Sequence, residues 1–183
     1  MREELRRPDR LLRREVDHLA YVVEDIPTAV EGWARLGVGP FFQSPNVEFE
    51  VLHRRDEPCV FEHSAAFARW GDIGLELQQI HRSEPPELAR ELGCGRGNGL
   101  NHVAYASPNP EGDSARLEEL GFPESVYCQA GPIEDRMHHV PALGHMIEIH
   151  LASDSLAGFW AAITEGSRGW DGSDPLRPMD VPS

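Results

Sequence analysis

Hydrophobic and polar residues alternate along the chain in short runs that are typical of β-strands, and two of these runs resemble each other. Residues 16–21 read Val-Asp-His-Leu-Ala-Tyr, and residues 100–105 read Leu-Asn-His-Val-Ala-Tyr. In both places a turn with proline follows, then a helix-compatible run, and then Leu-Gly. Because the histidine and this leucine are 18 residues apart in both places, we infer two copies of one structural module.

The first copy is expected to contain one strand, one helix and three further strands, judged from alternation, helical spacing and turn residues. Its strands are predicted at residues 16–23, 47–53, 59–68 and 73–80, and its helix at residues 28–36. The second copy repeats this β-α-β-β-β order in fewer residues. Its strands are predicted from residue 100 and at 125–130, 136–140 and 145–151, with a helix at 112–120.

These elements divide the chain into five segments. We predict a charged N-terminal extension (1–15), a first module (16–82), a linker with a short helix (83–99), a second module (100–152), and a C-terminal helix and tail (153–183). The tail is rich in Gly, Asp and Pro, which predicts a surface segment or a cap on a neighbouring element. The glycines of the linker do not form a dinucleotide-binding fingerprint, because Asn98 occupies the third glycine position.

Composition and charge narrow the range of partners. The 31 acidic and 17 basic side chains give a formal net charge of −14, which would repel nucleic acid and anionic membrane surfaces. All of the basic residues are arginine, so a lysine Schiff base and a P-loop lysine are excluded. Three isolated cysteines, and no apolar run of the ~18 residues that a membrane span needs, favour a soluble cytoplasmic protein with a small-molecule partner.

Charged side chains stand in two predicted strands where core residues would be expected. Alternate residues of a strand share a face. In the last strand of the first module, Glu76 therefore shares a face with Gln78, opposite leucine and isoleucine. In the last strand of the second module, Glu148 shares a face with His150, again opposite apolar residues. Each module thus turns one glutamate away from its apolar face.

Each module also begins with a histidine that has small neighbours. His18 shares its face with Ala20, and His102 shares its face with Ala104, which leaves room around each imidazole. Two imidazoles and two carboxylates in one cavity suit a divalent ion such as Zn, Ni, Co, Fe or Mn. Any one of these residues alone has an ordinary explanation as a solvent-facing or hydrogen-bonded side chain. Their repetition in both modules favours a metal site.

The other histidines and the tryptophans receive structural interpretations. His53, His63 and His81 have no carboxylate at ligand spacing, so we expect them at the surface or hydrogen-bonded. His145 has the opposite parity to Glu148. We expect Trp33, Trp160 and Trp170 to be packing residues.

In its motifs the chain resembles the vicinal oxygen chelate superfamily, which includes glyoxalase I, methylmalonyl-CoA epimerase, extradiol dioxygenases and bleomycin-resistance proteins. The resemblance covers about residues 16–152 and lies in the order of its motifs, which are 17–25, 75–77, 99–105 and 147–149. Residues 99–105 are most similar to the epimerase branch. Residues 39–42, Gly-Pro-Phe-Phe, are similar to glyoxalase-like bacterial members.

The resemblance implies an α+β fold in which two tandem βαβββ modules form a cupped, mixed or antiparallel sheet around a central cavity. It also implies that one divalent metal ion is held at four positions, which are His18, Glu76, His102 and Glu148. A homodimer is expected, partly because the sheet edges and the tail need cover.

A metal ion that holds two substrate oxygens stabilises the enolate formed when a neighbouring C–H loses its proton. We therefore hypothesise a metal-dependent isomerase, epimerase or lyase for a small oxygenated metabolite, with Glu76 or Glu148 as the base. Gln78 and His150 would line the cavity and contact the substrate, or face water at its rim.

Other functions stay open at this stage. The alternatives are a metal-free binding protein of the antibiotic-sequestering kind, an extradiol-type dioxygenase, and a regulatory subunit that keeps only the fold. The glutathione-binding context of glyoxalase I is missing. For an acyl-CoA substrate, the phosphates would need arginines, for which the candidates are Arg54, Arg55, Arg69 and Arg82.

Overall fold

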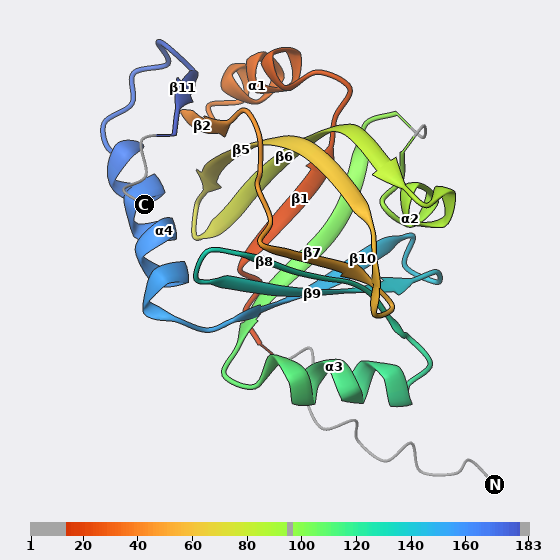
Figure 1. The fold of residues 1–183 in the computed structure, drawn as a ribbon. Helices are drawn as coiled ribbons and strands as arrows, with labels where there is room; N and C mark the ends of the chain where they lie inside the picture. The colour runs from red at the N-terminus through yellow and green to blue at the C-terminus, as the bar shows by residue number, and fades with distance from the viewer. Residues whose placement is uncertain (1–13, 95–96, 180–183) are drawn as a thin grey trace, which may run out of the picture.

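The computed structural model describes residues 14–94 and 97–179, which form eleven strands and four helices (Figure 1). Most of the predicted extension 1–15, two linker residues and the last four residues of the tail lie outside the described residues. In chain order the elements are β1 (His18–Val22), α1 (Ile26–Arg35), β2 (Phe41–Ser44), β3 (Val51–Arg54), β4 (Glu57–Pro58), β5 (Val60–Trp70), β6 (Ile73–Glu84), α2 (Pro86–Glu91), β7 (Gly99–Ser107), α3 (Pro110–Glu119), β8 (Glu124–Ala130), β9 (Ile133–Val140), β10 (His145–Leu151), α4 (Asp154–Gly166) and β11 (Leu176–Pro178).

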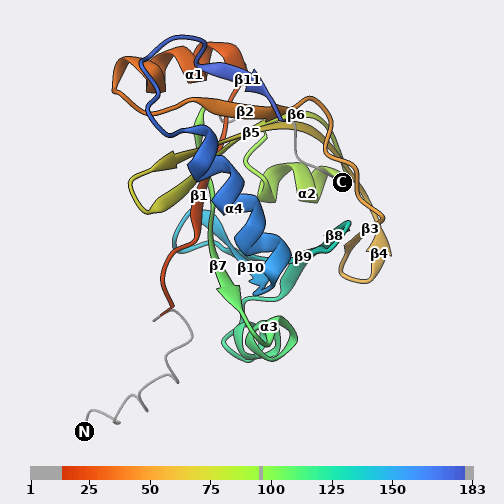
Figure 2. The same cartoon turned by 90° about the vertical axis from the view of Figure 1, so that its left-hand side faces the viewer.

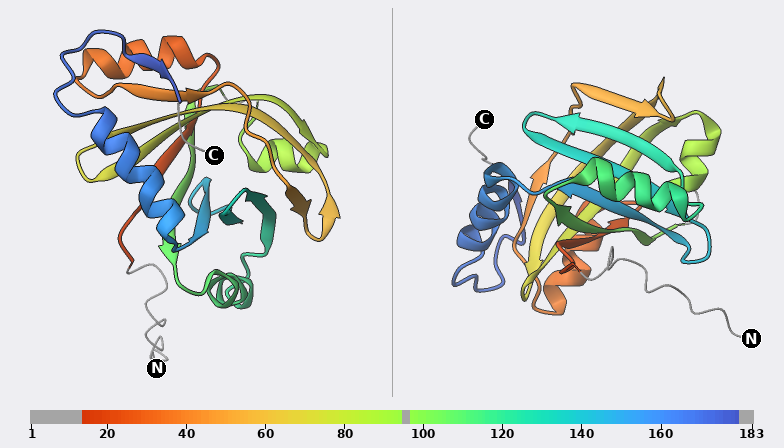
Figure 3. Two further views of the ribbon diagram at one scale, coloured as in Figure 1. Left: turned by 60° about the vertical axis from the view of Figure 1, so that its left-hand side comes forward. Right: turned by 90° about the horizontal axis from the view of Figure 1, so that it is seen from below.

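All described strands belong to one mixed sheet, in the order β11-β2-β5-β6-β1-β7-β10-β9-β8-β3-β4. The two repeated strands, β1 and β7, lie antiparallel at its centre. Each has the last strand of its own module as a parallel neighbour, β6 beside β1 and β10 beside β7. The sheet curves into a cup (Figure 3). The predicted α+β fold is confirmed, and its arrangement agrees with two paired βαβββ modules.

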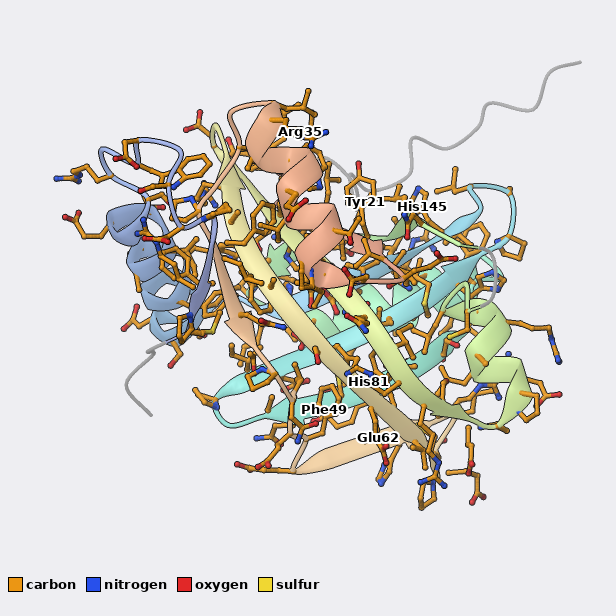
Figure 4. The ribbon with its side chains drawn as sticks, turned by 90° about the horizontal axis from the view of Figure 1, so that it is seen from above. Tyr21, Arg35, Phe49, Glu62, His81 and His145 are labelled. Atoms are coloured by element: carbon orange, nitrogen blue, oxygen red, sulfur yellow. The ribbon has the colours of Figure 1, made fainter. Side chains whose placement is uncertain are left out.

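Two helices cover the outer face of the sheet, one for each module. α1 begins after Asp25, whose side chain accepts a hydrogen bond from the Thr28 amide, and it buries Ile26 and Val30 against the outer side of β6. α3 begins after Asn109 in the same way and packs on the outer side of β7 and β10. In the view from above, α1 crosses the sheet (Figure 4).

The other two helices lie at opposite sides of the cup (Figure 1). α2 buries Leu88 and Leu92 in a cluster with Phe61 and Met146. α4 begins after Ser153, which caps the Leu156 amide, and runs past the open side of the cup (Figure 2). No helix in the described part of the chain has the length and apolar character needed to cross a membrane.

The first module differs from its prediction in two strands. The predicted strand 47–53 is observed as β3, which pairs with β8 of the second module, Leu52 opposite Cys128. The strand beside β5 is instead β2, whose four residues are too few to show alternation in the sequence. Alternation identifies a strand but not its neighbour, so the sequence alone could not place β3 at the far edge of the sheet.

Part of the tail belongs to the sheet. β11 pairs in parallel with β2, with Leu176 opposite Phe41, and thereby covers that edge of the sheet. The prediction of a surface segment or a cap is consistent with this position, because the preceding residues of the tail are largely exposed. Strand β10 has the predicted bounds, and the helix predicted within 153–183 is observed as α4.

Candidate metal centre

The four residues predicted as metal ligands meet on the inner face of the sheet. His18 comes from β1, His102 from β7, Glu76 from β6 and Glu148 from β10, so the four central strands each supply one. The register explains their convergence, because Ala20 of β1 lies opposite both Glu76 and His102. All four side chains are buried.

Their donor atoms form a compact group. The Nε2 atoms of His18 and His102 are 2.9 Å apart. An oxygen of Glu76 lies 3.4 Å from each of these nitrogens. An oxygen of Glu148 lies 3.1 Å from His102 Nε2 and 3.4 Å from His18 Nε2. Ligands about 2.1 Å from one ion lie roughly 3.0–3.4 Å from each other, so the donor atoms of His18, His102 and Glu148 fit a single divalent ion. Glu76 lies at the same range of distance from both histidines.

Both imidazoles are oriented by the residue that precedes them. Nδ1 of His18 is 3.1 Å from a carboxylate oxygen of Asp17, and Nδ1 of His102 is 2.7 Å from the amide oxygen of Asn101. A proton on each Nδ1 satisfies these bonds and leaves the lone pair of Nε2 facing the other ligands. Such outer hydrogen bonds are typical of histidines that ligate metals.

The electrostatics of the cluster also suit a cation. Burial alone would raise the pKa of Glu76, but hydrogen bonds from His102 and His18 outweigh it and hold the pKa well below its usual range. Burial alone would lower the pKa of His102, whereas the carboxylates of Glu148 and Glu76 raise it to about 9. The glutamates thus hold protons on the imidazoles. A metal ion would take the place of those protons, because ligands bind it in deprotonated form.

Gln78 and His150, the predicted substrate contacts, lie beside the two glutamates. Gln78 donates a hydrogen bond of 3.1 Å to Glu76. His150 bonds through Nδ1 to Asp135, and its Nε2 is 3.0 Å from Glu148. The donor atoms of Asp135, Glu148 and His150 lie close enough together to hold an ion. His150 therefore belongs to the same buried cluster as the predicted ligands.

A cavity of about 130 Å³ lies over the cluster. Sequence reasoning did not identify most of its walls, which come from β5, β8, β9, α4 and the segment before β3. His63 was expected at the surface or hydrogen-bonded, but it is buried, lines the cavity and has no hydrogen-bond partner for Nδ1 among the described residues. The period-two recurrence of Phe61, His63 and Phe67 on β5 was a signal for this inner face.

The other histidines agree better with expectation. His81 is hydrogen-bonded to Ser64, with 2.8 Å between His81 Nε2 and Ser64 Oγ. His145 bonds the Met146 carbonyl and does not line the cavity. Figure 4 shows it with Tyr21 on the side of the sheet that α1 covers.

Trp160 connects helix α4 to the cluster. Its indole N–H donates a hydrogen bond of 2.7 Å to Asp17, the residue that orients His18. Its ring lies over Gly74, where any Cβ would overlap the indole, and its centre is 5.5 Å from the His18 imidazole. Trp160 is thus a packing residue, as expected, but it also supports a predicted ligand.

Comparison with known proteins agrees with this architecture. A family model described as the glyoxalase/bleomycin resistance protein/dioxygenase superfamily matches residues 17–138. Among solved structures, a hypothetical protein from Bacillus halodurans C-125 is 16% identical, with a TM-score of 0.50 over 77% of this chain and 96% of that chain. The methylmalonyl-CoA epimerase of Mycobacterium tuberculosis is 17% identical, with a TM-score of 0.49 over 78% of this chain and 91% of that chain.

A variant of Streptomyces coelicolor methylmalonyl-CoA epimerase, in complex with 2-nitronate-propionyl-CoA, is 15% identical. Its TM-score is 0.46, over 76% of this chain and 99% of that chain. No curated protein sequence matches this chain significantly. At 16% identity, the likeness to the Bacillus halodurans protein concerns the fold and not the activity.

Proposed function

The chain belongs to the glyoxalase/bleomycin resistance protein/dioxygenase superfamily, and from this premise we propose that it is a metal-dependent isomerase, epimerase or lyase. Its substrate would be a small oxygenated metabolite. The observation that carries the proposal is that the Nε2 atoms of His18 and His102 are 2.9 Å apart and that each of two carboxylates, Glu76 and Glu148, lies 3.1 to 3.4 Å from both of them.

In this proposal His18, Glu76, His102 and Glu148 hold one divalent ion. Bound there, the ion would supply Lewis-acid stabilisation of the negative charge that develops on a substrate oxygen. Asp17 and Asn101 keep the two imidazoles in the tautomer that presents Nε2. The identity of the ion among Zn, Ni, Co, Fe and Mn is open, because all of them accept nitrogen and oxygen ligands.

Glu76 or Glu148 would act as the base that takes a proton from the substrate carbon. Both carboxylates are buried beside the cavity, within reach of a substrate seated there. Gln78 holds one oxygen of Glu76, and His150 contacts Glu148, so each base has a partner that can orient it. Returning the proton to the opposite face gives epimerisation, and returning it to another atom gives isomerisation.

The first experiment is the metal content of the purified protein by plasma mass spectrometry. We expect near-stoichiometric metal in the native protein and loss of metal in His18→Ala and Glu148→Ala, with the fold verified by circular dichroism. His145→Ala is the matched control, because His145 does not line the cavity. A native protein that stays metal-free after incubation with all five ions would overturn the proposal.

Turnover is tested with the metal-loaded protein in deuterated water. We expect exchange of the C–H next to a carbonyl in a panel of 2-oxo, 2-hydroxy and acyl-thioester compounds, seen by proton NMR, and loss of exchange in Glu148→Gln. Ligand binding without metal would favour the sequestering alternative. Oxygen consumption with a catechol would favour the dioxygenase alternative.

The homodimer and the cytoplasmic location stay predictions. Light scattering coupled to size-exclusion chromatography tests the first, against a chain mass of 20.5 kDa.

A further inference from the structure

Resting on the proposed function, we infer that the cavity is built for an uncharged substrate that carries a single aromatic ring, or a flat apolar group of that size. The ring would lie against the apolar walls, and the oxygens of the substrate would face the histidines and glutamates. Wall chemistry, volume, charge and unpaired polar atoms support this assignment independently of one another.

Five aromatic side chains contribute to the walls. They come from three parts of the chain: Phe49 from the segment before β3, Phe61 and Phe67 from β5, and Phe159 and Trp160 from α4. Phe67, Phe159 and Trp160 meet edge to face, with the centre of Phe159 5.0 Å from each of the others. Phe49, labelled in Figure 4, stacks with Phe61 of β5, their ring centres being 6.0 Å apart. Rings arranged in this way favour another ring.

The volume limits the ligand to one ring. The cavity measures about 130 Å³. For comparison, an engineered apolar cavity of about 150 Å³ binds benzene. A single ring with a short oxygenated arm that reaches toward the metal cluster therefore fills the cavity.

The charge of the lining disfavours an anion. Among residues 14–94 and 97–179 no arginine lines the cavity, and the sequence has no lysine. Three of the arginines proposed for phosphate binding are paired elsewhere: Arg54 and Arg55 with Glu91, and Arg82 with Glu62 and Glu84. The fourth, Arg69, lies over the Trp160 ring and bonds a backbone carbonyl. An acyl-CoA would find no arginine or lysine among the described lining residues for its phosphates.

Two buried polar atoms indicate where the substrate is polar. His63 Nδ1 and Gln78 Oε1 have no hydrogen-bond partner among the described residues, and both side chains line the cavity. Buried polar groups are normally paired, because an unpaired one forfeits its bond to water. A hydroxyl or ketone on the substrate arm would pair them. An aromatic hydroxyketone has this combination of ring and neutral oxygens.

The test compares three probes by NMR titration of the ¹⁵N-labelled protein. 2-Hydroxyacetophenone has the ring and is neutral, hydroxyacetone lacks the ring, and mandelate has the ring but is an anion. In chelator-treated protein we expect 2-hydroxyacetophenone to bind at least about 10-fold more tightly than either of the others. Burying a ring removes enough apolar surface from water for such a ratio.

A cavity variant locates the effect. Phe159→Ala, or Phe159→Leu if the first does not fold, should weaken 2-hydroxyacetophenone about 10-fold and leave hydroxyacetone unchanged. Phe122→Leu is the control, because Phe122 packs in the α3 cluster and does not line the cavity. Equal or tighter binding of hydroxyacetone or mandelate would overturn the inference.

The two proposals fail separately. Protein that binds metal stoichiometrically but shows no ring preference retains the proposed function and loses this inference. Protein that takes up no metal but prefers the neutral ring loses the proposed function and retains the cavity assignment.

Discussion

Gly74 of the first module stands where the second module has Met146, because Gly74 lies opposite His18 and Met146 lies opposite His102. Gly74 leaves the space that the Trp160 ring of α4 fills. Met146 fills its own space and is fully buried in the cluster with α2. The first module therefore needs the C-terminal helix to complete the surroundings of its histidine, and the second module does not.

The modules also differ two residues beyond each glutamate. Gln78 lies opposite Ala65, whereas His150 lies opposite Asp135 and bonds it. The first module is thus neutral at this position and the second carries a buried ionisable pair. Both modules thus supply one histidine and one glutamate as candidate ligands, which the strand register brings together. The side chains around these ligands differ between the modules. The difference indicates that metal binding and substrate selection are separable properties of this site.

The largest effect on metal binding should come from the ligands that both modules share. His18→Ala and His102→Ala should each weaken metal binding by about 3–4 kcal/mol, on the order of 100- to 1,000-fold, because structural zinc gains 10–16 kcal/mol from four ligands. Competition titration with a chromogenic chelator measures this. If one variant kept native affinity, the two modules would not be equivalent as ligand donors.

The two modules also line the cavity with different side chains. The first module contributes the ionisable His63, whereas the second contributes the apolar Ile133. Burial lowers the pKa of His63 to about 4, so the folded protein holds it neutral. Above pH 6.5 His63 is neutral in both the folded and the unfolded protein, so it does not reduce stability there. As the pH falls from 6.5 through about 4, the unfolded protein binds a proton that the folded protein does not, and the free energy of unfolding decreases. Phenylalanine does not bind a proton, so acid should reduce the free energy of unfolding of His63→Phe by up to about 3 kcal/mol less than that of the native protein.

Urea unfolding at pH 7 and pH 4 tests this prediction. The difference in unfolding free energy between the two pH values should shrink in the variant. The same loss of stability in both proteins would contradict the assignment of His63 as buried and neutral.

Gly74→Ala tests the space that distinguishes the first module. The added methyl would overlap the Trp160 ring and lie 2.7 Å from the His18 Cβ. We expect a loss of about 2 kcal/mol in the free energy of unfolding, as for overpacking of a core. Gly32→Ala is the control, because a Cβ there meets nothing within 4 Å and alanine favours a helix. Equal stability of the two variants would mean that Trp160 has room to move.

The smallest effect should come from giving the two imidazoles the same hydrogen-bond partner. Asp17→Asn gives the first module the residue type that the second has in Asn101. Loss of the negative charge beside His18 should weaken metal binding by about 10-fold, the lower end of the range for such supporting residues. The chelator competition described above measures it. A loss as large as that of His18→Ala would mean that Asp17 does more than orient the imidazole.

The repeat in the sequence predicted two βαβββ modules and four candidate side chains, and the resemblance to a known superfamily added the cupped sheet that brings them together. Histidine and glutamate recur at equivalent places and alternation assigns their faces, which made His18, Glu76, His102 and Glu148 candidates before any contact between strands was known.

What could not be predicted depends on contacts between distant segments. The amphipathic run in α4 shows that one face is buried but not that Trp160 meets Asp17, which lies 143 residues earlier. Alternation places His63 on one face with Phe61 and Phe67, but its burial follows from the cover supplied by other elements. The partner of β3 was hidden for the same reason.

The position of β3 and β4 bears on how the protein folds. These strands follow β2 in the first module, yet they close the edge of the second by pairing β3 with β8, so Val51 pairs with Gln129 of the other module. Such distant pairing slows folding, since a long loop must close before the contacts form. It also ties the stability of each half to the other. We expect one cooperative unfolding transition by circular dichroism and fluorescence, with no stage at which only one half is folded.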